Sequence, residues 1–348
     1  MVVPVLLLLA LRSSIGSQNQ KTAIESASTP ITLNHIYFTG QTSQYRIRAK
    51  LHIEERNANL LTFMPSNNIF KYDFYLRTLN VEAGNGTIRY YRPSISQLVD
   101  DGSSIDPKPH VTKLKMKADL VMSPINAILD DTDLSKKSAP KKKKSPIHSN
   151  QPLFVLSKNM SYRQDGLNPL LGFVQQVELL AVYIGGPGSS LDFAPQFSLY
   201  PVKVGDTWKQ TVGYQPQNLA EGAGKQKSVV QRLDLIYTYR GDSTYRGKPV
   251  RLVTATIDLK TDLAKFVEDQ FRESESVSHL KSFPLHLHEE MSFYLNPKTD
   301  QTIAADVHST GGFKILTTFS PNPVEEMKLR GKNHMYLLSN SIEKSRKK

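Results

Sequence analysis

Residues 45–53, YRIRAKLHI, alternate between apolar and polar side chains at every position. A period of two places successive side chains on opposite faces of a β-strand, so one face is apolar and the other polar. The same alternation recurs in residues 114–122 and 283–295. The apolar positions of the first two runs are Tyr45, Ile47, Ala49, Leu51, Ile53, Leu114, Met116, Ala118, Leu120 and Met122. These runs predict half-buried strands and a mainly β fold.

Turn signals between the strands favour antiparallel neighbours. The runs KYDFYLRTLNV and TIRYYRP flank EAGNG, which is typical of a hairpin turn at residues 84–86. A second hairpin is predicted at DSTYR, residues 242–246. Apolar side chains at helical spacing predict a helix at residues 169–184 and a short helix at 262–271. The expected fold class is mainly β (α+β), with a curved antiparallel sheet or two related sheets and one covering helix.

Composition shifts divide the chain into six parts. An apolar run of ten residues, VVPVLLLLAL, is too short to span a bilayer, which takes about 20 residues, and small residues follow it, as in an export signal. The predicted parts are a signal peptide at 1–16, a polar segment at 17–30, a first β-rich half at 31–129, a Lys-rich disordered linker at 130–152, a helix with a second β-rich half at 153–340, and a basic tail at 341–348.

The chain contains no cysteine. This excludes disulfides, thiolate zinc sites, a cysteine nucleophile and a lipid anchor attached through cysteine. An exported chain of this size without disulfides is typical of a bacterial envelope. We therefore expect a location in the periplasm, in the cell envelope or outside the cell.

The net charge of +12 is concentrated in two short tracts. One tract begins at Lys136 and ends at Lys144, and the other is the C-terminal tail. The charge forms no stripe with interleaved aromatic residues, so binding of nucleic acid is disfavoured. The lysine tract is interpreted as a solubilising linker, with contact to anionic surfaces as the alternative.

Residues 283–295, FPLHLHEEMSFYL, place His286, His288 and Glu290 at every second position. These residue types bind zinc, but a site needs three or four converging ligands. Leu285, Leu287, Met291 and Phe293 require the core face of the strand, so the two histidines are expected to face solvent and to bind no structural metal.

Other catalytic motifs are absent from the sequence. There is no Gly-x-Ser-x-Gly elbow, no His-Glu-x-x-His and no phosphate-binding glycine loop preceding a helix. No cofactor is expected, and catalytic residues stay unassigned. Two corners, Ser123-Pro124 and Asn296-Pro297, share a type I turn pattern and suggest two related halves.

The segment PVKVGDTW, residues 201–208, contains Pro201, Gly205, Asp206 and Trp208. Together with GKPVRLVTATIDL and FYLNPKTDQTIAADVHSTGGFKI, it resembles an uncharacterised class of exported bacterial proteins with a P-V-x-V-G-D-x-W segment. The resemblance covers mainly the second half and implies a β-rich envelope protein with no assigned reaction. Gly205-Asp206 is expected to form a turn with positive φ, and Trp208 is expected to enter the core.

The favoured function is a non-catalytic envelope protein that binds an apolar ligand or a protein partner. The first alternative is a metal-dependent or hydrolytic extracytoplasmic enzyme whose site no motif reveals. The second is a surface adhesion or assembly component that uses the lysine tracts.

Overall fold

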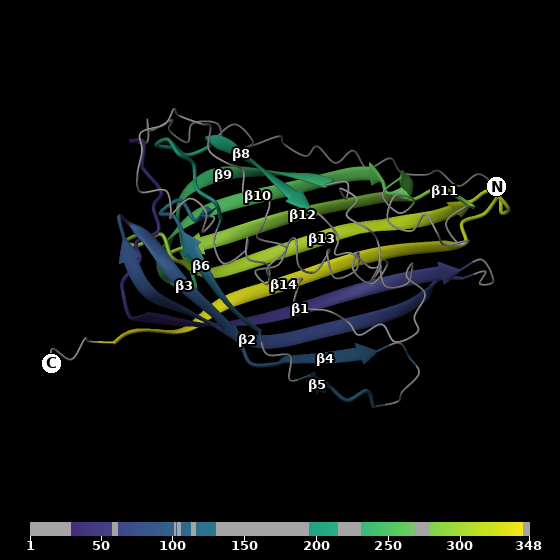
Figure 1. Cartoon of the computed structure of the whole chain (residues 1–348), viewed down its shortest axis with the longest axis horizontal. Helices are drawn as coiled ribbons and strands as arrows, with labels where there is room; N and C mark the ends of the chain where they lie inside the picture. Colours follow the sequence, from purple (N-terminus) through teal and green to yellow (C-terminus); the bar gives the residue numbers. More distant parts are fainter. Residues whose placement is uncertain are drawn as a thin grey trace, which may run out of the picture.

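The computed structural model describes residues 29–57, 62–100, 102, 106–112, 116–129, 195–214, 231–265, 268 and 279–343. Fourteen strands are present in this part of the chain (Figure 1). They are β1 (Gln41–Asn57), β2 (Met64–Glu82), β3 (Asn85–Arg92), β4 (Ile95–Asp100), β5 (His110–Thr112), β6 (Met116–Met122), β7 (Ile128–Leu129), β8 (Thr207–Tyr214), β9 (Gln231–Tyr245), β10 (Lys248–Asp262), β11 (Leu280–Ser282), β12 (Pro284–Leu295), β13 (Thr302–Thr317) and β14 (Glu325–Ile342).

The strands form one open antiparallel sheet. Its main path runs β7-β6-β3-β2-β1-β14-β13-β12-β10-β9-β8. Strand β4 extends the sheet beside β2 and pairs with β5, and β11 pairs with β13. The expected fold class is confirmed, and of its two forms the single sheet is the one present. No helix among the described residues is long and apolar enough to cross a membrane.

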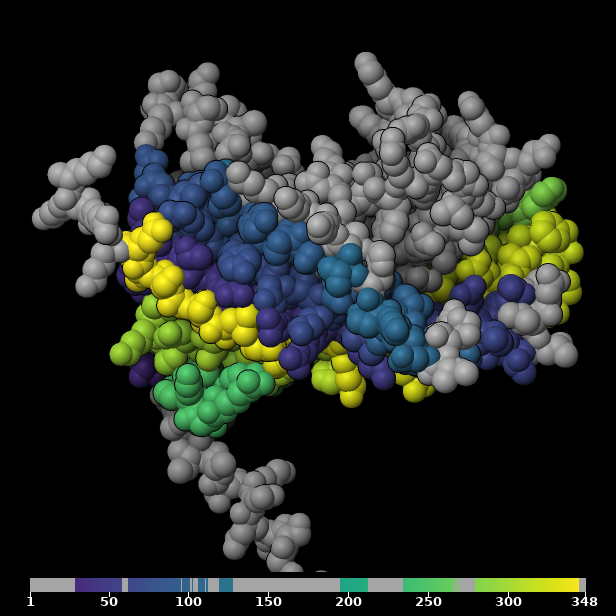
Figure 2. All heavy atoms as spheres, turned by 90° about the horizontal axis from the view of Figure 1, so that it is seen from below, coloured from purple at the N-terminus to yellow at the C-terminus, as the bar shows by residue number. Residues whose placement is uncertain are grey.

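The first and last strands lie side by side in the middle of the sheet. β1 and β14 pair from Gln41↔Ile342 to Asn57↔Glu325. Figure 2 shows the last strand, in yellow, running along the first strand, in purple. The two β-rich halves predicted from the sequence therefore share one continuous hydrogen-bonded sheet.

The two faces of the sheet differ in polarity. Along β1, the side chains of Tyr45, Ile47, Ala49, Leu51 and Ile53 are buried, as the alternation predicts. We call the face that carries these buried apolar side chains the inner face. The intervening positions form the outer face, where ion pairs join neighbouring strands, for example Arg46 Nε to Asp73 Oδ1 at 2.6 Å.

Both predicted hairpins are present, and in both the turn is displaced from the predicted residues, slightly in the first, predicted at 84–86, and further in the second. β2 and β3 are joined by Ala83-Gly84, with φ angles of 51° and 83°. In the second hairpin, Asp242–Tyr245 belongs to β9, and the turn is Arg246-Gly247, with φ angles of 50° and 76°. A two-residue turn with positive φ matches the twist of the strands, which explains why pairing continues to its edge.

The helix predictions have different outcomes. The helix expected at residues 169–184 lies outside the described residues, as do the expected signal peptide and the Lys-rich linker. At residues 262–271, Asp262 is the last residue of β10, whereas Ala264, Lys265 and Glu268 are helical. The basic tail was expected to begin at residue 341, but β14 continues to Ile342.

Candidate ligand-binding site

Residues 31–40 lie across one end of the sheet, at the left of Figure 1. Within this segment, the amide of His35 donates to the Pro124 carbonyl at 2.7 Å, and that of Ile36 donates to the Thr299 carbonyl at 2.9 Å. Ile31 and Val202 exchange two backbone hydrogen bonds. The segment therefore contacts three corners of the fold, and we call this region the closed end.

The two edges of the sheet also meet at the closed end. The corner between β6 and β7 belongs to one edge, and residues 195–206 lead into β8 at the other. Phe197 donates its amide to the Ile125 carbonyl at 2.9 Å, and Asn126 Nδ2 donates to the Pro195 carbonyl at 3.1 Å. These bonds hold the two edges together at this end of an otherwise open sheet.

The Pro-containing corners form turns of the predicted kind. The amide of Asn126 donates to the Ser123 carbonyl at 2.8 Å, and that of Thr299 donates to the Asn296 carbonyl at 3.3 Å. Asn126 has φ of 59°, a conformation that Asn tolerates better than most residues. Both corners contact residues 31–40, so the repeated turn pattern has a shared structural role.

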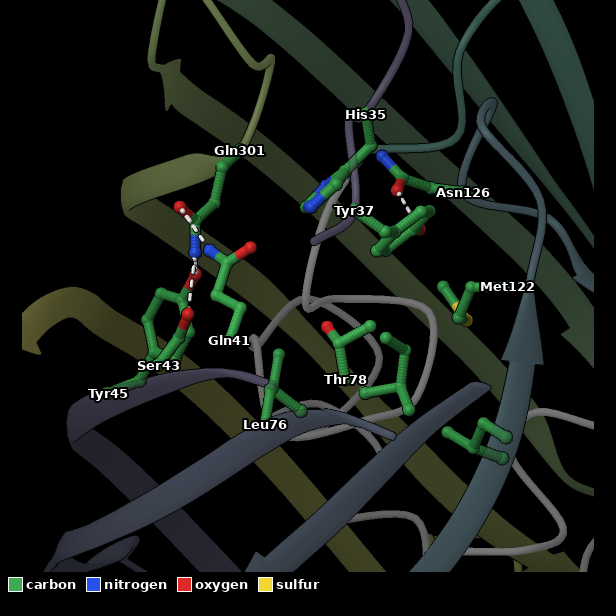
Figure 3. A pocket seen from close by; sticks show the side chains of 12 residues that line it. His35, Tyr37, Gln41, Ser43, Tyr45, Leu76, Thr78, Met122, Asn126 and Gln301 are labelled. Atoms are coloured by element: carbon green, nitrogen blue, oxygen red, sulfur yellow. Dashed lines mark hydrogen bonds between the residues drawn. The ribbon is translucent and has the colours of Figure 1, made fainter. Parts of the chain in front are cut away.

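A small cavity lies between the closed-end segment and the sheet (Figure 3). Its volume is about 40 Å³, which is room for a few water-sized groups. Twelve side chains line it: His35, Tyr37, Gln41, Ser43, Tyr45, Leu76, Thr78, Ile88, Leu120, Met122, Asn126 and Gln301. They come from segments far apart in the sequence.

One wall of the cavity is a network of uncharged polar groups centred on Gln301. Gln301 Nε2 donates to Ser43 Oγ at 2.8 Å and to Tyr45 Oη at 3.0 Å. Gln301 Oε1 accepts from Asn340 Nδ2 at 3.0 Å. Tyr45 Oη in turn donates to the Thr302 carbonyl at 2.9 Å. The network fixes these side chains, because each shares its hydrogen bonds with a buried neighbour.

His35 projects into the cavity with an unused ring nitrogen. Its ring stacks on Tyr37 with centroids 4.2 Å apart, and Tyr37 Oη donates to Asn126 Oδ1 at 2.9 Å. The residue is half-buried, but its Nδ1 atom is enclosed and has no hydrogen-bond partner among the described residues. In Figure 3 the ring extends toward the side of Gln41 and Gln301.

The titratable groups of the cavity are neutral at pH 7. Burial lowers the pKa of His35 to about 4, and burial raises the pKa of Tyr37 and of Tyr45 above the usual tyrosine range. No Asp, Glu, Lys or Arg side chain is among the twelve lining residues. A histidine with such a low pKa is a weak base at pH 7.

The opposite wall is apolar and continuous with the core. Ile88, Leu120 and Met122 belong to the buried cluster of the inner face, and Leu76 packs against it. The cluster extends along the strands to Met291, among others. The closed end thus places a small polar cavity beside a long apolar surface.

Two charged side chains, which the sequence analysis does not predict, lie on the inner face. Glu289 lies between Leu287 and Met291 on β12 and is 0% exposed. Arg92 is 1% exposed, and its guanidinium lies 5.1 Å from the centroid of the Tyr72 ring. The alternation in residues 283–295 itself places Glu289 on the apolar face, so the sequence contained the signal.

The structure places His286, His288 and Glu290 on the outer face of β12. All three are exposed, and His288 Nε2 is 3.7 Å from Glu290 Oε1. In the described ranges, no group of three or more His, Asp or Glu residues is arranged to hold a metal ion. The absence of a structural metal stays a prediction.

The PVKVGDTW segment forms the entry to β8. Gly205 has φ of +93°, and Asp206 Oδ2 accepts from the Lys203 amide at 2.8 Å. Trp208 stacks on Tyr237, with centroids 5.5 Å apart, and donates Nε1–H to the Gln196 carbonyl at 2.8 Å. Trp208 is half-buried against the core, whereas Pro201 is exposed. The segment therefore shapes the turn beside the closed end.

A chain of hydrogen-bonding groups lies on the outer face, away from the cavity. His334 Nδ1 is 2.6 Å from Asp306 Oδ1, and its Nε2 is 3.4 Å from Tyr245 Oη. The contact with His334 lowers the pKa of Asp306. The arrangement is a carboxylate–histidine–hydroxyl relay, the geometry that activates a nucleophile in some hydrolases.

Comparisons with solved structures give distant likenesses. No protein-family model matches the chain, and no curated protein matches it. A lipovitellin structure on lipid–protein interactions has a TM-score of 0.41 and 9% identity over 90% of this chain and 26% of that one. This chain therefore spans about a quarter of that protein.

Two bacterial structures match less closely. A DUF1329 family protein from Desulfovibrio piger has a TM-score of 0.19 and 8% identity, over 87% of both chains. A putative outer membrane lipoprotein-sorting protein domain from Vibrio parahaemolyticus has a TM-score of 0.15 and 5% identity, over 87% of this chain and 86% of that one. Likeness at this level carries no argument about function, and the protein class suggested by residues 201–208 stays a prediction.

Proposed function

We propose that the protein is a non-catalytic envelope protein that holds an apolar small molecule against the inner face of its sheet. A sheet face this apolar needs a second layer, because exposed apolar area costs about 25 cal/mol per Å². In the described part of the chain, nearly all buried apolar side chains stand on the strands. Those outside them are Leu33, Phe197, Val202, Leu263 and Phe283.

The proposal rests on this observation: in the described part of the chain, few buried apolar side chains outside the strands could form a second layer. Residues 31–40 and 195–202 cover the closed end. The inner-face side chains of the middle strands, such as Ala255, Met291 and Val307, are only 1–3% exposed, so a ligand reaches them only by taking the place of what now buries them. The cavity of about 40 Å³ is too small for a whole ligand, so the ligand lies along the face and only its end reaches the cavity. The predicted helix at residues 169–184 is the competing cover.

Purification from the native host followed by organic extraction and mass spectrometry tests the proposal. We expect an apolar compound in stoichiometric amount. A matched pair of variants locates it: Ala255→Leu adds bulk on the buried inner face, whereas Thr256→Leu places the same side chain on the outer face of the same strand. The first should carry less ligand, and the second should carry as much as the wild type. Protein that is free of any apolar compound would contradict the proposal.

Export is the second part of the proposal and rests on the composition of residues 1–16. The mature chain is then expected to begin near Ser17, outside the cytoplasm. The intact mass of protein taken from its own host checks this. A chain that retains Met1 and fractionates with the cytosol would contradict it.

The relay on the outer face supports one alternative, a hydrolytic enzyme. Asp306, His334 and Tyr245 lie at hydrogen-bonding distances, but none of them lines the cavity described above. Hydrolysis of ester substrates by the wild type that is lost in Tyr245→Phe would favour the enzyme. The surface-adhesion alternative depends on the tract from Lys136 to Lys144, which lies outside the described residues.

A further inference from the structure

We propose that the cavity at the closed end binds the small uncharged head group of the apolar ligand, namely a hydroxyl. This rests on the proposed function and goes further, because it assigns the ligand to a chemical class, the long-chain or polycyclic alcohols. Three features of the cavity support the assignment: its unused hydrogen-bonding atom, its lack of charge and its size.

The unused atom is Nδ1 of His35, which has almost no accessible surface in this structure, so the proposal requires the ring to turn toward the cavity when the ligand binds. A buried polar atom without a partner costs about 1–3 kcal/mol, so native sites supply it with a partner. The neutral ring nitrogen either donates or accepts, depending on the tautomer. A hydroxyl satisfies both tautomers, because it carries one donor and two acceptor sites. A ketone oxygen would satisfy only one of them.

The polar wall opposite His35 fits the same group. Gln41, Ser43, Tyr45 and Gln301 already hold one another in fixed orientations. Such a preorganised set of neutral dipoles binds a hydroxyl without reorganising.

The uncharged lining of the cavity excludes carboxylic acids, such as the fatty acids that correspond to these alcohols. No lining side chain is charged, and the nearby Asp300 carboxylate is occupied by Arg251 Nη1 at 2.7 Å and by the Asn34 amide at 2.9 Å. Burial keeps His35 and the two lining tyrosines neutral. A carboxylate placed here would lose its hydration without gaining a cation, which is strongly unfavourable.

Size favours a small head group. A volume of about 40 Å³ accommodates a hydroxyl with one or two water molecules, whereas a phosphocholine or a sugar would extend out of the cavity. Leu76, Ile88, Leu120 and Met122 form the apolar wall and would contact the first carbons next to the hydroxyl. The apolar remainder of the ligand then follows the inner face.

Three ligands of equal chain length test the assignment. The delipidated full-length protein is loaded with the neutral probe N-phenyl-1-naphthylamine, and dodecan-1-ol, dodecanoate and dodecane compete with it at pH 8. We expect dodecan-1-ol to bind at least about tenfold more tightly than dodecanoate, since tenfold corresponds to 1.4 kcal/mol.

Variants connect this preference to the cavity. His35→Phe keeps the ring stacked on Tyr37 but removes both nitrogens, and should weaken dodecan-1-ol binding about fivefold while leaving dodecane binding unchanged. His35→Asn should restore part of the affinity. The control is His308→Phe, the same change at an exposed position of β13, and it should have no effect.

The outcomes separate the two proposals. If the probe and dodecane bind but dodecanoate binds as tightly as the alcohol, or if His35→Phe changes nothing, the head-group assignment is wrong and the proposed function stands. If neither the probe nor any of the three ligands binds, both are wrong.

Discussion

Glu325, at the start of β14, has a pKa that is shifted by its position on the apolar side of the sheet. It stands on the inner side of the strand, near Glu55 of β1. Burial, and to a smaller extent the charge of Glu55, raise the pKa of its carboxyl from 4.5 to about 7. The folded protein therefore holds this proton more tightly than the unfolded chain does. The resulting stability is present below about pH 4.5 and is lost as the pH rises through 7.

Replacement of Glu325 by glutamine should stabilise the protein at high pH only. At pH 8, Glu325→Gln removes a buried charge, and the free energy of unfolding should rise by about 1–2 kcal/mol after allowance for screening by water. At pH 5 the native carboxyl is protonated and resembles the amide, so only a small change is expected, from the partial ionisation of the unfolded chain. Urea unfolding at both pH values measures this, with the exposed Glu290→Gln as the control. Equal stabilisation at both pH values would show that charge is not the cause.

The histidines of β12 should be dispensable for stability. Their side chains stand on the outer face, where substitutions usually change stability by no more than about 0.5 kcal/mol. The double variant His286→Ala/His288→Ala should therefore melt close to the wild type, as checked by calorimetry. The metal prediction fails if untagged wild-type protein contains stoichiometric zinc, copper or nickel that the double variant lacks.

At the scale of the elements, β13 is held unusually close to its neighbours. A Cβ atom at Gly311 would meet the His286 carbonyl of β12, and one at Gly312 would meet the Met327 carbonyl of β14. Both obstacles are backbone atoms, which cannot rotate away. The two glycines thus allow three central strands to approach one another.

Gly312→Ala should therefore be strongly destabilising for so small a change. Overpacking against a fixed backbone costs about 1–3 kcal/mol, and we expect a loss near the upper limit. Thr310→Ala, on the exposed side of the same strand, is the control and should cost much less. Chemical denaturation of the two variants compares them. Equal losses would mean that the close approach is not important for stability.

The strands were predictable from sequence because alternation is a local property. The alternation of residues 45–53 gives the inner face of β1, and the alternation of residues 283–295 places Glu289 on the inner face of β12. The pairing of β1 with β14 was not predictable, because strands almost 300 positions apart leave no local trace of their register. The cavity was hidden for the same reason: His35, Asn126 and Gln301 meet only after the sheet has formed.

At the scale of the whole molecule, the fold is an open sheet with one apolar face and one end at which its edges meet. A ligand that lies along this face would contact inner-face residues of several strands and would end beside His35. The apolar chain of the ligand is therefore expected to contact the inner-face side chains, and its hydroxyl is expected to contact the cavity. The outer face, with its ion pairs and exposed histidines, would have no contact with it.

Photo-crosslinking tests this account most directly. A long-chain alcohol with a diazirine in the middle of its chain is bound to the delipidated protein, irradiated and mapped by tandem mass spectrometry. We predict labels on inner-face residues of the central strands, such as Ala255, Met291 and Val307. Labels confined to outer-face residues such as Thr256 and Glu290, or labelling no greater than in the dark control, would contradict the account.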